Sequence, residues 1–295
     1  MSDSAPLSTA AAVRALVLSA FAFSLMGLGV KLAGQRLPSS ELVFFRALVA
    51  LVLCAVMLRR AGLDPRGRHR ALLLLRGLFG FGALSCFFYA LTRLPLAEAT
   101  VIQYTNPIFT ALVASRLLGE RASPRVFLAT FLGLAGVVVI TRPAALASAR
   151  AVALEPLAIL VGLLGAVLTA VAYVLVRRLA RAGEHELVII LYFPLVAVPA
   201  SVPAMVPEML WPTPGEWLLL LGVGAAAQTA QVYLTRGIKH LPAARATVVL
   251  YAQVVFATLW GIVLLGERPD LWTAAGSLLV LAGTVVAARR ERLPA

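Results

Sequence analysis

Long runs of apolar residues recur along the whole chain and limit the folds that it can adopt. A water-soluble core cannot bury so much apolar surface, since 61% of the residues are hydrophobic and only 13% are charged. Inside a bilayer the backbone must satisfy its own hydrogen bonds, which segments of this length do as helices. We therefore predict an all-α membrane protein with ten transmembrane helices, at about 13–33, 40–58, 71–92, 95–118, 124–141, 155–177, 186–206, 216–236, 242–265 and 271–288.

The first apolar stretch, with Arg14 ahead of it, has features of a secretory signal. It is followed by Lys31, Arg36 and another apolar span, and not by a small-residue cleavage site and a soluble domain. We interpret it as a retained helix.

Positive charge is distributed unevenly between the two predicted membrane faces. The chain has 26 Lys and Arg against 13 Asp and Glu, a net charge of +13. With ten spans, 18 basic residues fall on the face that holds both termini, six fall on the other face, and Arg46 and Arg76 fall within spans. Because Lys and Arg collect in cytoplasmic loops, we predict that both termini are cytoplasmic. This face accounts for the net charge, so no nucleic-acid partner is expected.

Cysteine and histidine are too few and too scattered to indicate metal or redox chemistry. Cys54 and Cys86 lie in apolar spans, where Cys behaves as a small hydrophobe. The histidines, His69, His185 and His240, lie in predicted cytoplasmic connections. We expect no metal, no cofactor and no catalytic residue.

The pentapeptide LLGER occurs at 117–121 and again at 264–268, each time at the end of an apolar run. The same offset of 147 aligns LPLAEATVIQYTNPIFTALVASRLLGER (94–121) with LPAARATVVLYAQVVFATLWGIVLLGER (241–268). The fourth span therefore matches the ninth, the duplicated unit has five helices, and an odd number of crossings inverts the second copy. We predict two inverted repeats, 13–143 and 155–288, with a linker at 144–154 and cytoplasmic tails at 1–12 and 289–295.

Ten predicted helices in a five-plus-five repeat resemble the EamA-type members of the drug/metabolite transporter superfamily. FFRALVA (44–50) and RGLFGFGALSCFFYAL (76–91) are similar to the second and third helices of that family, and FYALTRLPLAEATVIQYTNPIFTALVASRLLGER (88–121) closes a helix pair in the same way. The resemblance implies small-molecule transport without ATP, and it does not fix the molecule. The second half departs from the pattern at Tyr251-Ala252-Gln253-Val254, where the first has Tyr104-Thr105-Asn106-Pro107, so strict symmetry of the site is in doubt.

A polar stripe and a proline coincide in the fourth span. Gln103, Asn106 and Thr110 are three and four residues apart and share a helix face. Pro107 removes a backbone donor and displaces the carbonyl of Gln103, which predicts a kink. We favour a cavity lining; the alternative is hydrogen bonding between helices, worth about 0.6 kcal/mol per contact.

Further polar residues lie deep in other spans. The eighth span carries Gln228 and Gln231, the ninth carries Tyr251 and Gln253, and this face either looks into a cavity or packs structurally. Arg46 lies about 8 Å into the second span, where it either binds substrate or extends to the outer headgroups. Arg76, near the cytoplasmic end of the third span, is expected to extend to the headgroups.

The repeated LGER motif is interpreted as architectural. Gly119 and Gly266 terminate helices, and the acidic and basic residues that follow each glycine tie a tight turn to its neighbour. These acidic and basic residues are Glu120 and Arg121 in the first copy and Glu267 and Arg268 in the second.

These features together predict a multi-pass secondary transporter in a bacterial-type cytoplasmic membrane, in contact with membrane lipids. We expect alternating access and facilitated export or exchange of a small polar metabolite, and Arg46 suits an anionic group on it. The absence of a deeply placed Asp or Glu argues against strong proton coupling. A lipid or amphiphile carrier is the alternative, and a membrane-embedded lipid-modifying enzyme is a remote one; the oligomeric state stays open.

Overall fold

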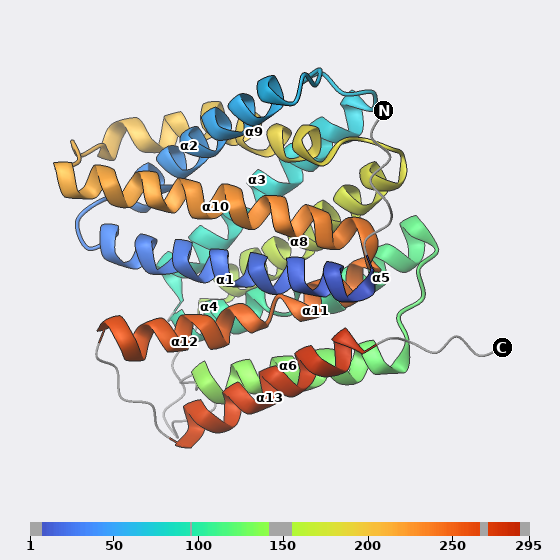
Figure 1. Cartoon of the computed structure of the whole chain (residues 1–295). Helices are drawn as coiled ribbons and strands as arrows, with labels where there is room; N and C mark the ends of the chain where they lie inside the picture. The colour runs from blue at the N-terminus through green and yellow to red at the C-terminus, as the bar shows by residue number, and fades with distance from the viewer. Residues whose placement is uncertain (1–7, 95, 142–154, 266–270, 290–295) are drawn as a thin grey trace.

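The computed structural model describes residues 8–94, 96–141, 155–265 and 271–289. Within these ranges every regular element is a helix, which confirms the predicted all-α class (Figure 1). The helices are α1 (Thr9–Ala33), α2 (Ser39–Arg60), α3 (Arg70–Arg93), α4 (Leu96–Gln103), α5 (Asn106–Leu118), α6 (Pro124–Thr141), α8 (Pro156–Arg181), α9 (Glu186–Met205), the short 3-10 helix η1 (Val206–Glu208), α10 (Pro214–His240), α11 (Ala243–Val249), α12 (Ala252–Leu265) and α13 (Leu271–Ala288).

Eight helical stretches of the described chain are long and apolar enough to cross a membrane, and Pro124–Ile140 is a shorter apolar helix. Two predicted spans prove to be divided. The fourth consists of α4 and α5, and the ninth consists of α11 and α12.

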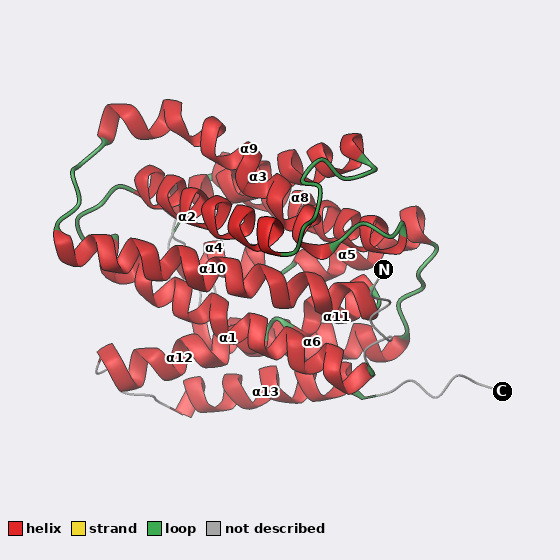
Figure 2. Cartoon of the chain, turned by 45° about the horizontal axis from the view of Figure 1, so that its top comes forward, coloured by secondary structure: helices red, strands yellow, loops and turns green. Residues whose placement is uncertain are grey.

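Corresponding helices of the two halves run in opposite directions. In Figure 1, α6 runs from right to left and α13, its counterpart in the second half, runs beside it from left to right. The contacts between the halves repeat as well. Helix α1 of the first half packs on α10 of the second, and their counterparts, α8 and α3, pack on each other (Figure 2). The bundle therefore has an approximate two-fold relation between inverted units.

Close contacts between α6 and α13 follow this relation residue by residue. A methyl group on Gly136 would meet the carbonyl oxygen of Gly276 at 2.5 Å, and one on Gly283 would meet that of Ala129 at 2.7 Å. The offset of 147 converts the first pair into the second. Small residues thus allow the same close helix approach twice, as is common in membrane interfaces.

The helix breaks lie at equivalent positions. α4 ends at Gln103 and α5 begins at Asn106, while α11 ends at Val249 and α12 begins at Ala252. The Tyr251 hydroxyl donates a 2.6 Å hydrogen bond to the carbonyl oxygen of Tyr104, its partner at the offset of 147. Pro107 indicated the first break, but the second has no proline and was not predicted.

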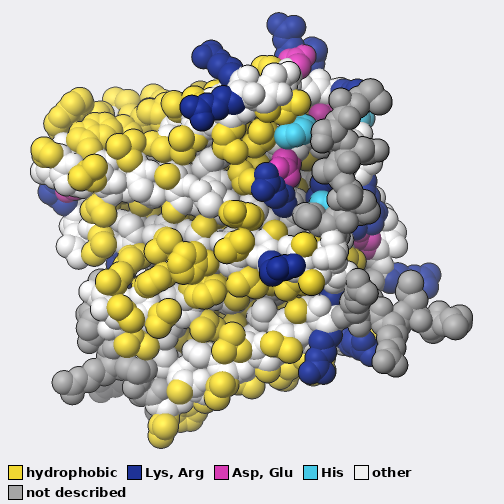
Figure 3. Space-filling model, viewed as in Figure 1, with side chains coloured by type: hydrophobic (Ala, Val, Ile, Leu, Met, Phe, Trp, Pro, Cys, Tyr) yellow, Lys and Arg dark blue, Asp and Glu magenta, His cyan; other side chains and the backbone are white. Residues whose placement is uncertain are grey.

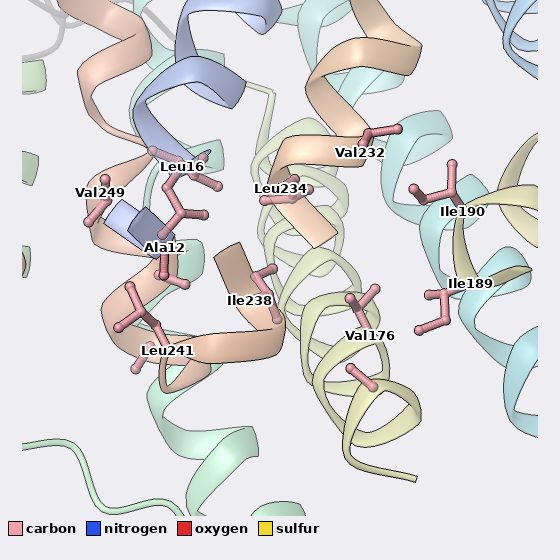
Figure 4. Packing of buried hydrophobic residues seen from close by; sticks show 14 of the residues in the cluster. Ala12, Leu16, Val176, Ile189, Ile190, Val232, Leu234, Ile238, Leu241 and Val249 are labelled. Atoms are coloured by element: carbon pink, nitrogen blue, oxygen red, sulfur yellow. The ribbon is translucent and has the colours of Figure 1, made fainter. Parts of the chain in front are cut away.

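Buried aliphatic side chains fill the space between α1, α10 and α11 (Figure 4). Leu16, Ile238, Leu241 and Val249 meet there and are almost fully buried. A methyl group on Gly237 would overlap the side chain of Leu16, so this glycine lets α1 and α10 approach closely. This packing fixes α1 and α10, both of which contribute side chains to the lining of a cavity.

Basic side chains collect at one end of the bundle, where α2, α5, α8, α10 and α13 finish; we call it the basic end (Figure 3). Gly119 ends α5 there in a left-handed conformation with φ of 66°. Next to it, Glu120 pairs with Arg177 at 2.9 Å and with Arg181, and accepts a 2.9 Å hydrogen bond from the backbone N–H of Ala243. One carboxylate thus joins α5 to α8 and α11.

A second carboxylate at the basic end joins two loops. Glu184 accepts 2.6 Å hydrogen bonds from the backbone N–H groups of Arg68 and His69. Burial raises the pKa of Glu184, but these hydrogen bonds and the His69 side chain outweigh burial and bring the pKa below its usual value.

Gly77 is predicted to be essential for the contact between α3 and α9. A methyl group there would collide with the carbonyl oxygen of Tyr192, a backbone atom that cannot move aside easily. We expect Gly77→Ala to destabilise the protein by about 1–3 kcal/mol, measured as a lower midpoint of thermal unfolding in detergent. Gly222→Ala is the control, because nothing lies within 4 Å of the added methyl group. An unchanged midpoint for Gly77→Ala would contradict this packing.

Glu120→Gln is predicted to lower stability without changing ligand affinity. The substitution removes a negative charge from between Arg177 and Arg181, and the Glu120 side chain is only 10% exposed. We expect a loss of about 2 kcal/mol, less than for a fully buried pair. Glu208→Gln, at an exposed carboxylate, should leave the unfolding midpoint nearly unchanged. Normal unfolding with binding abolished would instead place Glu120 in the binding machinery.

Candidate functional site

Two adjoining cavities lie at the centre of the bundle. The first, about 180 Å³, is lined from α1, α2, α3, α4, α8, α9 and α10, and we call it the arginine chamber because Arg46 and Arg76 contribute to it. The second, about 200 Å³, lies along the two helix breaks, and we call it the amide chamber after Gln103, Asn106 and Gln253. Both chambers share a wall formed by Phe23, Phe87, Gln103 and Tyr173.

Two guanidinium groups approach one aromatic ring in the arginine chamber. The Cζ atoms of Arg46 and Arg76 lie 5.5 and 5.3 Å from the centre of the Phe193 ring, within range of cation–π attraction. Arg76 also donates a 3.3 Å hydrogen bond through Nη2 to Oε1 of Gln231 on α10. Phe193 therefore lies against two cations, one from α2 and one from α3, and Gln231 binds the second of them.

Several donor atoms of this pair have no hydrogen-bond partner among the described residues. They are Nε of Arg46 and both Nε and Nη1 of Arg76, all of them buried. The Arg76 residue as a whole is only 4% exposed. A buried donor without a partner is destabilising by about 1–3 kcal/mol, and more when it is charged.

The chamber walls carry no opposing charge. No Asp or Glu is found among the described residues that line either chamber. Glu41, on the same helix as Arg46, accepts a hydrogen bond from the backbone N–H of Leu210 at 3.1 Å. The electrostatic potential of the arginine chamber is therefore positive.

The first helix break builds the polar wall between the chambers. The carbonyl of Gln103, which Pro107 was predicted to displace, accepts a 3.0 Å hydrogen bond from the Asn106 side chain. Gln103 donates through Nε2 to the Thr169 hydroxyl at 3.1 Å, while its Oε1 atom has no partner in the described part of the chain. A free acceptor thus lies where the two chambers meet.

The structure brings together five of the eight side chains that were predicted to bind substrate. Those that line the chambers are Arg46, Gln103, Asn106, Gln231 and Gln253. Thr110, Gln228 and Tyr251 lie outside the lining. Thr110 bonds the carbonyl of Asn106 at 2.8 Å, Gln228 lies against Met57, and Tyr251 is fully buried in its bond to Tyr104.

Sequence reasoning missed several lining residues. Arg76 was expected to reach the headgroups, and this expectation was wrong because its guanidinium turns inward between Phe193 and Gln231. Phe193 and Thr169 gave no signal, since aromatic and hydroxyl side chains are common in membrane helices. Gly80, four residues after Arg76 and in the glycine-rich run of α3, makes room for this guanidinium: a methyl group there would lie 3.2 Å from Nη1.

The architectural interpretation of LGER agrees with the geometry at its first copy. Gly119 has the conformation of a helix terminator and Glu120 links three helices, whereas Arg121 is exposed. Gly266, Glu267 and Arg268 lie outside the described residues, so their role stays a prediction.

A third, larger cavity of about 460 Å³ lies between α2, α3, α9 and η1, and we call it the outer cavity. Its lining includes Ser39 and Ser40 at the start of α2 and Glu208 of η1, at the end of the bundle opposite the basic end. Leu84 lines both this cavity and the arginine chamber. The outer cavity and the arginine chamber therefore lie on either side of Leu84.

Comparison with known proteins gives one consistent result. The pseudopaline exporter CntI of Pseudomonas aeruginosa is 35% identical over 277 residues, which cover 94% of this chain and 95% of the exporter. Solute carrier family 35 member G1 of Homo sapiens is 29% identical over 293 residues, which cover 93% of this chain and 78% of that protein. A solved structure described as "Crystal structure of protein" has a TM-score of 0.81 and 25% identity, and the match covers 94% of this chain and 96% of that one.

The family model of the EamA-like transporter family matches residues 11–142 and again residues 156–289. The two matches correspond to the two inverted units of the bundle, and they confirm the resemblance to the drug/metabolite transporters. The family and the relatives are transporters and not enzymes, and the apolar helices agree with an integral, multi-pass membrane protein. Because the matches together span nearly the whole chain, the protein belongs to the EamA-like transporter family.

Proposed function

We propose that this protein is a secondary transporter that exports a small polar organic anion across a bacterial-type cytoplasmic membrane by alternating access. The observation that carries the proposal is the pair Arg46 and Arg76, which face a central chamber without a described acidic residue in its lining. The 35% identity to an exporter supports the direction of transport.

The electrostatics of the chamber favour an anionic substrate. A buried charge is strongly destabilising unless an opposite charge or hydrogen-bond acceptors compensate it. Here the nearest compensation is one amide oxygen, of Gln231, and one aromatic ring. A carboxylate or phosphate would supply both the charge and the acceptors that the arginines lack.

The charge distribution supports an orientation. The basic end gathers the ends of α2, α5, α8, α10 and α13 with their Arg and Lys residues, and such residues accumulate on the cytoplasmic side. We propose that ten crossings, with α4–α5 and α11–α12 each counted as one, place both termini in the cytoplasm. The outer cavity then faces the outside.

The arrangement of the ends supports alternating access. At the basic end, Glu120 with Arg177 and Arg181 closes the bundle, while the outer cavity approaches the arginine chamber from the opposite side. This conformation corresponds to an outward-facing state. Inverted units allow an inward-facing state of the same construction, in which the two halves exchange conformations.

The lining argues for facilitated export or exchange. Proton-coupled carriers use a carboxylate at membrane depth as a proton relay. The described chamber residues include none. The substrate itself, moving down its gradient or in exchange for another anion, supplies the driving force in this proposal.

A lipid or amphiphile carrier is the second candidate, and the outer cavity favours it. Phe81, Leu84 and Phe88 give this cavity an apolar lining that suits an acyl chain. The arginine chamber favours the polar anion, because two cations there would disfavour an acyl chain.

Replacing Arg46 tests the function. Arg46→Gln should reduce counterflow of an anionic substrate in proteoliposomes by about tenfold or more, because charge-assisted hydrogen bonds are lost, and should affect a neutral analogue little. Arg14→Gln, the same change at an exposed position of α1, should leave both activities unchanged. Equal losses for the anion and its neutral analogue on Arg46→Gln would remove Arg46 from the site.

Single-cysteine labelling tests the orientation. In a protein with Cys54 and Cys86 replaced by Ala, a cysteine at Arg66 should be protected from an impermeant reagent in intact cells, and one at Met209 should react. Both positions are exposed, Arg66 at the basic end and Met209 at the opposite end. Reaction of both from the same side would refute the inverted topology.

A further inference from the structure

We infer that the transported molecule carries two acid groups at one end, bound by Arg46 and Arg76 together, with an N–H or O–H donor beside them that binds Gln103. This inference rests on the proposed export of an anion and specifies its chemical class.

The first step is the count of charges. Arg46 and Arg76 bring two positive charges to one small chamber, where both guanidinium groups lie over the ring of Phe193. The carboxylates at the starts of α9 and α10 have other partners: Glu186 pairs with Arg236 at 2.7 Å and Glu216 pairs with Arg36 at 2.5 Å. A ligand with a single acid group would leave one cation without compensation in a buried site. Two acid groups, or one doubly charged phosphate, balance the pair.

The second step is the count of donors. Nε of Arg46 and Nε and Nη1 of Arg76 have no partner within the described residues. Gln231 binds the Nη2 atom of Arg76, and Gly80 leaves space beside Nη1. Three fixed donors on two side chains match the oxygens of two acid groups better than those of one.

The third step concerns the junction with the amide chamber. Oε1 of Gln103 lacks a partner, and the hydrogen bond from Nε2 to Thr169 fixes the amide so that Oε1 remains an acceptor. Gln103 lines both chambers. An amine or hydroxyl next to the acid groups would reach this oxygen, and an uncharged polar remainder would extend between Asn106 and Gln253.

Binding assays on the full-length protein in lipid nanodiscs test the inference. The ligands are L-aspartate, L-glutamate and O-phospho-L-serine, each compared with its counterpart that has one acid group fewer: L-asparagine, L-glutamine and L-serine. Ligands with the additional acid group should bind about tenfold or more tightly to the wild type. The phosphate and carboxylate pairs show which acid the chamber prefers. Succinate, which lacks a donor beside its acid groups, should bind more weakly than L-malate, whose hydroxyl can donate to Gln103 without changing the charge.

Three variants locate the effect. Arg76→Gln should remove the preference for the additional acid group, while Arg76→Lys, which keeps the charge, should retain part of it. Gln231→Glu should place a carboxylate beside Arg76 and thereby raise the thermal stability of the ligand-free protein, while it removes the same preference. Gln35→Glu, at an exposed loop position, should change neither property.

The outcomes separate this inference from the proposed function. If anion transport by the wild type depends on Arg46, but ligands with one and with two acid groups bind equally well, the inference fails and anion export stands. Equal weakening of both ligand classes by Arg76→Gln would also overturn it. Failure of every ligand with two acid groups to bind at millimolar concentration would overturn the inference, and absence of any anion transport would overturn both.

Discussion

The positive charge of two buried guanidinium groups is the constraint on which the interior of this transporter depends. A cation within an apolar bundle is destabilising unless its surroundings compensate it. In this protein the compensation is incomplete: Phe193 lies against both arginines and Gln231 binds one of them, while three donor atoms remain without described partners. An anionic ligand completes the set. Stability and specificity are thereby linked, because the feature that disfavours the empty site favours the filled one.

The two inverted units explain how such a site can face each side in turn. Contacts such as Gly136 with Gly276, and Gly283 with Ala129, repeat under the same offset that relates the two LLGER motifs. The helix breaks also repeat, and Tyr251 bonds the backbone of its own counterpart, Tyr104. Interrupted helices at membrane depth are tolerated where they line a cavity, and here they border the amide chamber. The site itself is not symmetric, because the offset of 147 relates Arg46 to Phe193 and Arg76 to Val223.

The sequence predicted the fold well because apolar length is a strong signal in membrane proteins. Apolar runs and the internal repeat predicted an all-helical chain in two units, and Gly119 predicted the end of α5. Positions that depend on neighbouring helices were less accessible. Arg76 lies six residues into α3, close enough to the helix start to suggest the headgroups, and only the packing of α9 and α10 turns it inward. The break at Leu250–Tyr251 has no proline, so no local signal marks it. Thr110 and Gln228 share helix faces with the lining residues Asn106 and Gln231, and helix periodicity alone does not separate a cavity from a packed interface.

Structure determination of the protein with a bound amino acid that carries two acid groups tests the central claim most directly. The account predicts density for the acid groups between Arg46 and Arg76, in contact with the three donor atoms that now lack partners, and an amine within hydrogen-bond distance of Gln103. Density for the ligand in the outer cavity beside Ser39, Ser40 and Glu208, with both guanidinium groups uncontacted, would contradict it.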